Sequence, residues 1–316
     1  MRVVICTHKA DIDGLFSASV ALMKFPKSRI SFYDYGVKSF KKMFEYIKCE
    51  SRKTTGGLVI ISDLGINDNA VFSLFEETIH YLKKRHWSVI WVDHHPWDRE
   101  SLKSARKYAK LFLNSTGKKC ATEIMYEKFM YKNKIAEQLK LIAHSSDFMT
   151  NLKNHDTRLS ELIHYYRIGE NSKQNLEALV EKASRGTLWD SDMQRDYTKF
   201  IKISDFQKKE SLKTLKILNI LSFNVAFVFT YPYVQTSLFS HELFTNRNID
   251  LALLYNRTGK VSIRRNTDKI SCRKIASLLV EGGGHEYASG AKLKTNPKDV
   301  KGCIGELKEA IVRALS

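Results

Sequence analysis

Three short runs rich in β-branched residues each lead into aspartate, and this pattern constrains the fold more than any other feature of the sequence. Residues 3–6, 58–61 and 89–92 are predicted strands, followed by Asp11 and Asp13, by Asp63 and by Asp93. A further strand at 30–35 and helical patterns at 15–25, 39–47 and 70–84 alternate with them. This alternation predicts βαβ units and a mainly parallel sheet. Because the carboxyl ends of parallel strands share one edge, where ligands bind, we expect the aspartates to converge there.

The second half of the sequence predicts a separate, smaller α/β domain. No Pro or Gly interrupts residues 192–218, whose apolar residues have helical spacing and predict one long connecting helix. Strands at 225–230, 251–255 and 261–264, helices at 273–280 and 304–315, and a glycine cluster between these helices follow it. We therefore expect an α/β protein: a mainly parallel, doubly wound domain at 1–190, a connecting helix at 191–220 and a second domain at 221–316. The active site would lie in the cleft between the two domains.

The charge and cysteine content narrow the class of protein. The 316 residues carry a net charge of +18, which attracts polyanions such as nucleic acid or an anionic membrane surface. The five cysteines show no C-x-x-C spacing, which disfavours a zinc knuckle or a disulfide framework and fits a reducing cytoplasm. No apolar run reaches the roughly 18 residues that span a bilayer. The first residues predict a strand and no signal peptide, so we expect a cytoplasmic protein without a membrane partner.

Histidines lie beside the clustered aspartates, and together they indicate a metal site. Taken singly, an Asp at a strand end commonly caps a helix or closes a turn. Clustered carboxylates in a half-buried site repel one another, however, and cations relieve that cost. Neutral imidazole beside carboxylate suits Mn²⁺, Fe²⁺ or Zn²⁺, and the excess of carboxylates favours Mn²⁺ or Mg²⁺. The residues concerned are His8, Asp11, Asp13, Asp63, Asp93, His94, His95 and Asp147, the last of which follows a helical pattern at 121–143.

These residues stand in short motifs that resemble a known family. The order and spacing of four motifs are similar to those of the DHH phosphoesterase superfamily: His8-Lys9-Ala10-Asp11-Ile12-Asp13-Gly14, Ser62-Asp63, Asp93-His94-His95 and Ser145-Ser146-Asp147. The later run Gly282-Gly283-Gly284-His285, followed by Ala288-Ser289-Gly290-Ala291, resembles the glycine-rich motif of the DHH-associated C-terminal domain. That domain marks the branch of RecJ-like exonucleases, nanoRNases and cyclic-dinucleotide phosphodiesterases. One departure is Glu286, which stands where the family often has Pro.

The resemblance implies a set of roles for these residues. One divalent ion would be held by His8, Asp11 and Asp63, and a second by Asp13, Asp63, His94 and Asp147, with Mn²⁺ the expected metal and Mg²⁺ or Co²⁺ the alternatives. Asp63 would bridge the ions, and His95, oriented with the help of Asp93, would contact the phosphate or protonate the leaving oxygen. Arg264, Gly282, Gly283, Gly284 and His285 would hold the substrate.

A basic stripe is predicted on the connecting helix. At 100° per residue, six cations fall on one narrow face: Arg195, Lys199, Lys202, Lys209, Lys213 and Lys216. The stripe would either follow a nucleic-acid backbone or form a solvated helix face.

Three functions remain open at this point. The first is a nuclease, an exonuclease or oligonucleotidase, that acts on single-stranded DNA or RNA or on short oligonucleotides. The second is a cyclic-dinucleotide phosphodiesterase or small-nucleotide phosphatase, which needs no long basic surface. The third is a non-catalytic scaffold that binds replication or repair proteins, and the complete ligand set counts against it. The expected protein partner is a second copy of the chain or a replication or repair protein.

Overall fold

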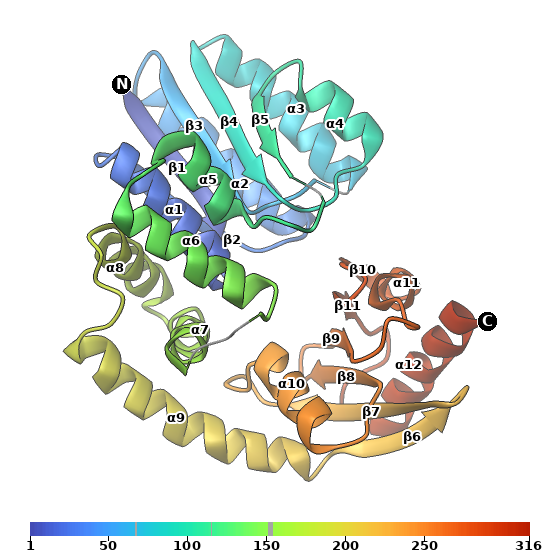
Figure 1. Ribbon diagram of the computed structural model, residues 1–316. Coiled ribbons are helices and arrows are strands. Elements are labelled where there is room, and N and C mark those ends of the chain that lie inside the picture. Colours follow the sequence, from blue (N-terminus) through green and yellow to red (C-terminus); the bar gives the residue numbers. More distant parts are fainter. Residues whose placement is uncertain (67, 115, 151–153) are drawn as a thin grey trace. The chain divides into compact units, whose positions relative to one another are not determined.

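The computed structural model describes residues 1–66, 68–114, 116–150 and 154–316. The chain divides into two compact units, residues 1–195 and 196–316, which we describe separately as unit 1 and unit 2. Unit 1 begins with the predicted parallel sheet (Figure 1). Its five strands run in parallel in the spatial order β2-β1-β3-β4-β5, with bounds β1 (Arg2–His8), β2 (Arg29–Tyr33), β3 (Gly57–Ser62), β4 (Trp87–Asp93) and β5 (Lys110–Leu113).

Helices cover both faces of this sheet, so the predicted doubly wound architecture is confirmed. Two helices that pack on one face are α2 (Val37–Arg52) and α3 (Asn69–Lys83). The opposite layer contains α1 (Ile12–Lys24), α5 (Ala121–Phe129), α6 (Lys134–Asp147) and α8 (Ser172–Ser184). Two further helices of this unit are α4 (Arg99–Ala105) and α7 (Asn154–Tyr166). Because alternate strand residues point to opposite faces, strands buried on both sides read as continuous apolar runs.

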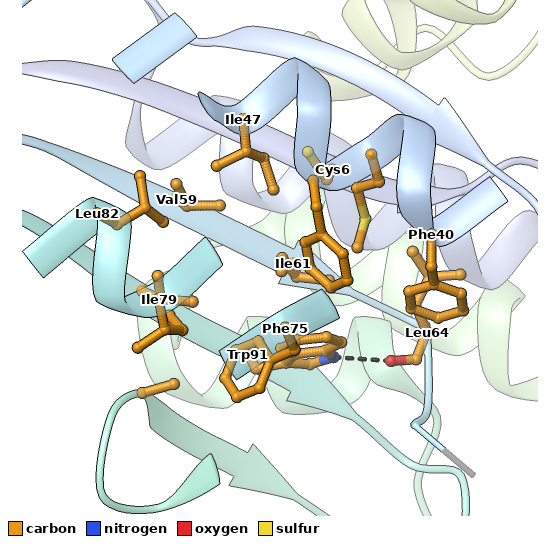
Figure 2. Packing of buried hydrophobic residues seen from close by; sticks show 14 of the residues in the cluster. Cys6, Phe40, Ile47, Val59, Ile61, Leu64, Phe75, Ile79, Leu82 and Trp91 are labelled. Carbon is orange, nitrogen blue, oxygen red and sulfur yellow. Dashed lines mark hydrogen bonds between the residues drawn. The ribbon is translucent and has the colours of Figure 1, made fainter. Parts of the chain in front are cut away.

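The core beneath α2 and α3 fixes the loop that follows β3. Val59 and Ile61 of β3 pack with Trp91 of β4 and with Phe75 of α3 (Figure 2). The indole N–H of Trp91 donates a hydrogen bond of 2.7 Å to the carbonyl of Leu64. This buried contact holds the backbone one residue beyond Asp63, so the core of unit 1 also positions a predicted site residue.

Unit 2 contains a six-stranded mixed sheet in the order β10-β11-β9-β8-β7-β6. Only β7 and β8 pair in parallel, and the other pairs are antiparallel. The strands are β6 (Lys216–Ile220), β7 (Phe223–Thr230), β8 (Leu251–Asn256), β9 (Lys260–Arg265), β10 (Val280–Gly284) and β11 (Ala288–Lys292). The helices are α10 (Thr236–Asn246), α11 (Cys272–Ser277) and α12 (Val300–Leu315). An apolar core lies between α11, α12 and one face of the sheet.

The long connecting helix is shorter than predicted. Helix α9 spans Ser191–Leu212 and carries the boundary between the two units, and residues 216–220 then form β6. The hydroxyl of Thr214 accepts a 2.9 Å hydrogen bond from the backbone N–H of Phe229, and β6 pairs along β7. Pairing with β7 outweighs the local helical pattern, so the second sheet begins before residue 221.

Two smaller predictions also need correction. The helical pattern at 121–143 is two helices, because Asn133 caps the start of α6 through its side chain, and Asp147 is the last residue of α6. The glycine cluster is the edge strand β10. In the part of the chain that the structure describes, no helix is long and apolar enough to cross a membrane.

Candidate metal centre

The strand order places the predicted ligands at the reversal point of the sheet. β1 lies between β2 and β3, so the chain winds in opposite directions from β1, and ligands bind beyond the carboxyl ends at such points. His8 ends β1, Asp63 follows β3, and Asp93 ends β4. Asp147 arrives at the same place from the end of α6. The topology therefore brings residues from four separate sequence motifs into one cluster.

The first group of ligand atoms contains His8, Asp11 and Asp63. The Nδ1 atom of His8 lies 3.0 Å from Asp11 Oδ2 and 3.3 Å from Asp63 Oδ2. Asp11 also caps α1, since its Oδ1 accepts a hydrogen bond from the backbone N–H of Gly14. The capping role and the site role thus use different oxygens of one carboxylate. Gly14 is required there, because a Cβ would lie 2.3 Å from the carbonyl oxygen of His8.

The second group contains Asp13, His94 and Asp147. His94 Nε2 lies 3.8 Å from Asp13 Oδ2, and its Nδ1 lies 3.7 Å from Asp147 Oδ2. Each oxygen of Asp13 accepts one backbone N–H from the start of α5, at Ala121 and Thr122. These two bonds hold the carboxylate rigid and leave each oxygen with further acceptor capacity. In both groups, one ligand atom from each residue lies within 4.8 Å of the others.

Asp63 connects the two groups. Its Oδ2 faces His8, whereas its Oδ1 lies 3.4 Å from His94 Nε2. The backbone of Asp63 has φ of 57°, in the left-handed region that non-glycine residues seldom adopt. Such conformations persist where the surrounding structure holds them, and they gather at functional sites. The strained backbone thus points one oxygen of a buried carboxylate at each ligand group.

Burial and mutual repulsion shape the protonation of this cluster. Burial, with the charge of Asp63, raises the pKa of Asp13, and burial likewise raises the pKa of Asp147. Burial opposes ionisation of Asp63 too, but the imidazoles of His8 and His94, 3.3 Å and 3.4 Å from its oxygens, outweigh this effect and lower its pKa. Burial acts to lower the pKa of His94, yet Asp63, Asp147 and Asp13 raise it to about 11. Protons on histidine thus offset part of the clustered negative charge.

The residues fit a pair of divalent cations. Asp147 Oδ2 and His8 Nδ1 are buried and have no hydrogen-bond partner of good geometry among the described residues. Buried polar atoms normally have such partners, so these two atoms indicate a ligand. The atoms that could bind a metal are carboxylate oxygens and imidazole nitrogens, a set that suits Mn²⁺ and related ions. A third group, Asp63, His94 and His95, also brings its ligand atoms within 4.8 Å.

His95 is held by groups that lie outside the predicted ligand sets. Its Nδ1 lies 2.8 Å from Asp93 Oδ1, and the other oxygen of Asp93 accepts a 2.7 Å hydrogen bond from the indole of Trp97. Burial acts to lower the pKa of His95, and Asp93 raises it overall. The fully buried Asp93 thus fixes the orientation of the His95 ring.

The sequence interpretation missed Tyr35. Its hydroxyl lies 3.0 Å from each ring nitrogen of His95 and 3.3 Å from the carbonyl of Asp63, and its ring packs edge-on against His8. A signal was available, because Tyr35 follows β2 and reaches the same sheet edge as the aspartates. No comparable sequence signal pointed to Trp97, because its hydrogen bond to Asp93 depends on the path of the turn after β4.

In unit 2, the sheet brings the predicted substrate-binding residues together. Gly283 and Gly284 of β10 lie opposite Gly290 and Ser289 of β11. The neighbouring residue of β11, Ala288, pairs with Arg264 of β9, and His285 donates its backbone N–H to Ala288. The half-buried Arg264 donates from Nη1 to the carbonyls of Ile263 and Ser289.

Gly282 has a packing role that the sequence interpretation did not assign. A Cβ at this position would lie 1.7 Å from the carbonyl oxygen of Ala276, so β10 passes against α11 with no room for a side chain. The strand shifts register between Val280 and Gly283. Gly283, in contrast, has open space around its Cβ position. Of the three glycines, Gly283 is therefore the one whose backbone a ligand reaches most readily.

The basic stripe is only partly on one helix face. Arg195, Lys199, Lys202 and Lys209 lie on α9, but Lys213 follows its end and Lys216 belongs to β6, because the helix stops at Leu212. Three of these cations have an acidic partner three residues earlier. The pairs are Arg195 with Asp192, Lys199 with Asp196 and Lys213 with Glu210.

Comparison with known proteins gives a family match for the N-terminal part of the chain. Residues 2–150 match the DHH family, N-terminal domain. No curated protein sequence matches at a significant level. The chain is similar to the DHH domain of a member of the S1p family of ribosomal proteins, with 16% identity, a TM-score of 0.63 and coverage of 99% of this chain and 87% of that chain.

Two further solved structures share the fold. One is PggH, a pGpG-specific phosphodiesterase from Vibrio cholerae, with 13% identity, a TM-score of 0.59 and 99% of each chain covered. The other is an exopolyphosphatase-related protein from Bacteroides fragilis, with 14% identity, a TM-score of 0.58 and coverage of 99% of this chain and 92% of that chain. At these identities the likeness concerns the fold alone.

Proposed function

Because residues 2–150 form a DHH-family N-terminal domain, we propose that the protein is a metal-dependent phosphodiesterase that hydrolyses single-stranded or short nucleic acid. Unit 1 would hold two divalent ions, Mn²⁺ in the first place and Mg²⁺ or Co²⁺ as alternatives. Water would attack phosphorus in line with the leaving oxygen.

One observation carries this proposal, namely the placement of the Asp63 carboxylate. One of its oxygens faces His8 and Asp11, and the other faces His94, so a single residue serves both ligand groups. Two ions about 3.5 to 4 Å apart stabilise the attacking and leaving oxygens of an in-line displacement. Asp63 is buried, and its backbone is held by the Trp91 contact to the next residue, so the shared ligand is positioned in advance.

Other side chains of the protein would position the substrate and transfer the proton. Asp93 and Trp97 orient His95, which would contact the phosphate or donate a proton to the leaving oxygen. In unit 2, Arg264 of β9 would bind a substrate phosphate, and the backbone of Gly283 in β10, two strands along the same sheet, would also hold the substrate. We thus propose residues 1–190 as the catalytic domain, residues 191–215 as the connection, and strand β6 together with residues 221–316 as a DHH-associated substrate-binding domain.

A small-nucleotide substrate, including a cyclic dinucleotide, is the second candidate. Three stripe cations are paired with aspartate or glutamate on their own segment, which reduces the charge that a long strand would meet. Surface pairs of this kind contribute little to stability, but they lower the local positive potential. The similar structure of PggH is that of a pGpG-specific phosphodiesterase.

A length series tests both candidates. The purified chain, stripped of metal and then given Mn²⁺, Mg²⁺ or Zn²⁺, is incubated with end-labelled RNA and DNA of about two, five and twenty nucleotides and with a cyclic dinucleotide. Cleavage in a ladder, dependent on metal, supports the nuclease and reveals its polarity. Cleavage confined to dinucleotides supports the second candidate. Bound metal without hydrolysis of any of these substrates would contradict both and favour a non-catalytic scaffold.

A further inference from the structure

An open groove of about 630 Å³ lies at the amino end of the sheet in unit 1. It is lined by the first residues of β4, 87–90, and by the side chains of Lys83, His86 and Lys110. The metal ligands lie at the other end of the same strands. Because a strand rises about 3.3 Å per residue, the two ends of β4, Trp87 and Asp93, lie roughly 20 Å apart. The groove is therefore a surface separate from the metal centre.

Two basic runs of the chain meet at this groove. The first, at and after the end of α3, is Lys83, Lys84, Arg85 and His86. The second, which leads into β5, contains Lys103, Arg106, Lys107 and Lys110. Neither run contains Asp or Glu, and within the described ranges Lys83, His86 and Lys110 are exposed and form no ion pair with a carboxylate. The groove thus keeps its positive charge, whereas half of the stripe cations are paired with acidic residues.

Aromatic side chains hold the two basic runs in place. The Nζ atom of Lys83 lies 4.5 Å from the centre of the Tyr108 ring, so the first run contacts the second. A neutral ring attracts an ammonium group without cancelling its charge. Trp87 donates its indole N–H to the carbonyl of Thr54, and a Cβ at Gly57 would lie 2.6 Å from the Trp87 ring. The cations therefore start from a well-packed backbone, which lowers the entropic cost of binding a ligand.

The side chains of the groove favour a nucleic acid over a protein or a lipid surface. Its exposed lining residues are polar or charged, and none is large and apolar: Lys83, His86, Ser88 and Lys110. Protein interfaces are enriched in aromatic residues and depleted of Lys, and helices that lie on a membrane insert apolar side chains. Nucleic-acid interfaces are instead polar and strongly positive, and lysine and serine side chains commonly contact phosphate oxygens.

We propose that this groove binds the phosphate backbone of a single-stranded nucleic acid at a second site, independent of the metal ions. Lys83 and Lys110 would each contact a phosphate, and the hydroxyl of Ser88 would donate to the same strand. The site goes beyond the proposed phosphodiesterase function, because it requires neither metal nor hydrolysis. It would give a long strand an affinity that a dinucleotide bound at the metal centre does not gain.

The test measures binding of a fluorescein-labelled oligo(dT) of about 20 nucleotides to the full chain. Fluorescence anisotropy is recorded in the presence of a chelator over a range of salt concentrations. Lys83→Gln combined with Lys110→Gln should flatten the salt slope by about 1.4, or about 0.7 per contact, and weaken binding about 25-fold at about 0.1 M salt. Lys83→Arg combined with Lys110→Arg keeps both charges and should preserve the slope.

Lys24→Gln combined with Lys27→Gln is the matched control. Both lysines are exposed, belong to unit 1 and precede β2, at the opposite edge of the same sheet from β5. This pair removes the same charge and should leave the salt slope unchanged, and thermal unfolding checks that each variant is folded. Equal changes in the two glutamine pairs would show a general effect of net charge and would overturn the groove site.

Ultraviolet cross-linking of the bound strand, followed by mass spectrometry, locates the contact. We expect cross-linked peptides to contain residues 83–90 or 103–112, and cross-links confined to other segments would overturn the proposal. Polyglutamate that displaces the strand as well as unlabelled oligo(dT) does would overturn it in favour of an acidic protein. None of these measurements depends on turnover. Weakened binding in the groove pair alone, in a chain that hydrolyses no phosphodiester, would refute the proposed function and leave the groove site standing.

Discussion

The hydroxyl of Tyr35 lies 3.0 Å from each ring nitrogen of His95, although the two residues are 60 positions apart in the sequence. Nδ1 of His95 also faces Asp93, so Nε2 is the nitrogen that Tyr35 can hold without competing with that carboxylate. The hydroxyl can donate to a neutral ring or accept from a protonated one. Tyr35 and Asp93 thus hold His95 from two sides.

This contact predicts a selective effect of Tyr35→Phe. The change removes the hydroxyl and keeps the ring that packs against His8. We expect kcat to fall about 10-fold, the equivalent of one hydrogen bond of about 1.4 kcal/mol, with KM and bound metal unchanged. His95→Ala should lower kcat by about 100-fold or more and also keep both ions. Steady-state kinetics and metal analysis check both variants. Loss of an ion from His95→Ala would instead make His95 a ligand, as its grouping with Asp63 and His94 allows.

Asp63→Asn tests the shared ligand with the least disturbance to the backbone. Asn tolerates the left-handed conformation of this position, whereas Ala there would add strain. We expect activity to fall by at least about 1000-fold and metal affinity to drop, because both ligand groups lose a charged oxygen. The thermal unfolding temperature, measured in the presence of a chelator, should not fall, because the substitution removes one buried negative charge from a repulsive cluster. Near-normal turnover with metal bound would contradict the two-ion arrangement.

Metal binding should release protons, because groups with a raised pKa hold protons in the metal-free cluster. The pKa of His94 is raised to about 11, and those of Asp13 and Asp147 are also raised, so the metal-free cluster carries protons near pH 7. A cation displaces these protons, so affinity should rise with pH below the pKa of His94. Calorimetry of Mn²⁺ binding in buffers of different ionisation enthalpy measures the release. A Mn²⁺ affinity that stays constant between pH 6 and pH 8 would refute the predicted proton release.

The basic stripe is best tested with Lys202 and Lys209, which lie seven residues apart on α9 and are both exposed. If both contact phosphates, changing them to Gln should reduce the salt slope of binding to a long single strand by about 1.4, or about 0.7 per contact. Lys301 and Lys308 of α12 form a control pair with the same spacing and exposure. Equal slopes for the two double variants would show that the stripe is a solvated helix face.

The sequence by itself determined the parallel sheet and the convergence of the aspartates. The reason is local: β-branched runs alternate with helical patterns, and each acidic residue follows a strand or ends a helix. Once the strands are parallel, their carboxyl ends share an edge, so His8, Asp63 and Asp93 have to meet. The motif order adds the candidate metal ligands, because carboxylate and imidazole side chains can be recognised in the sequence without coordinates.

Only the tertiary structure decided how these groups are held. Asp13 accepts hydrogen bonds from Ala121 and Thr122, more than a hundred residues away, and Tyr35 reaches His95 from the segment that follows β2. The end of α9 was likewise set by pairing between β6 and β7, against a local pattern that continues the helix. Such contacts join residues distant in sequence, and no local propensity or spacing encodes which partner a backbone N–H or a side chain will find.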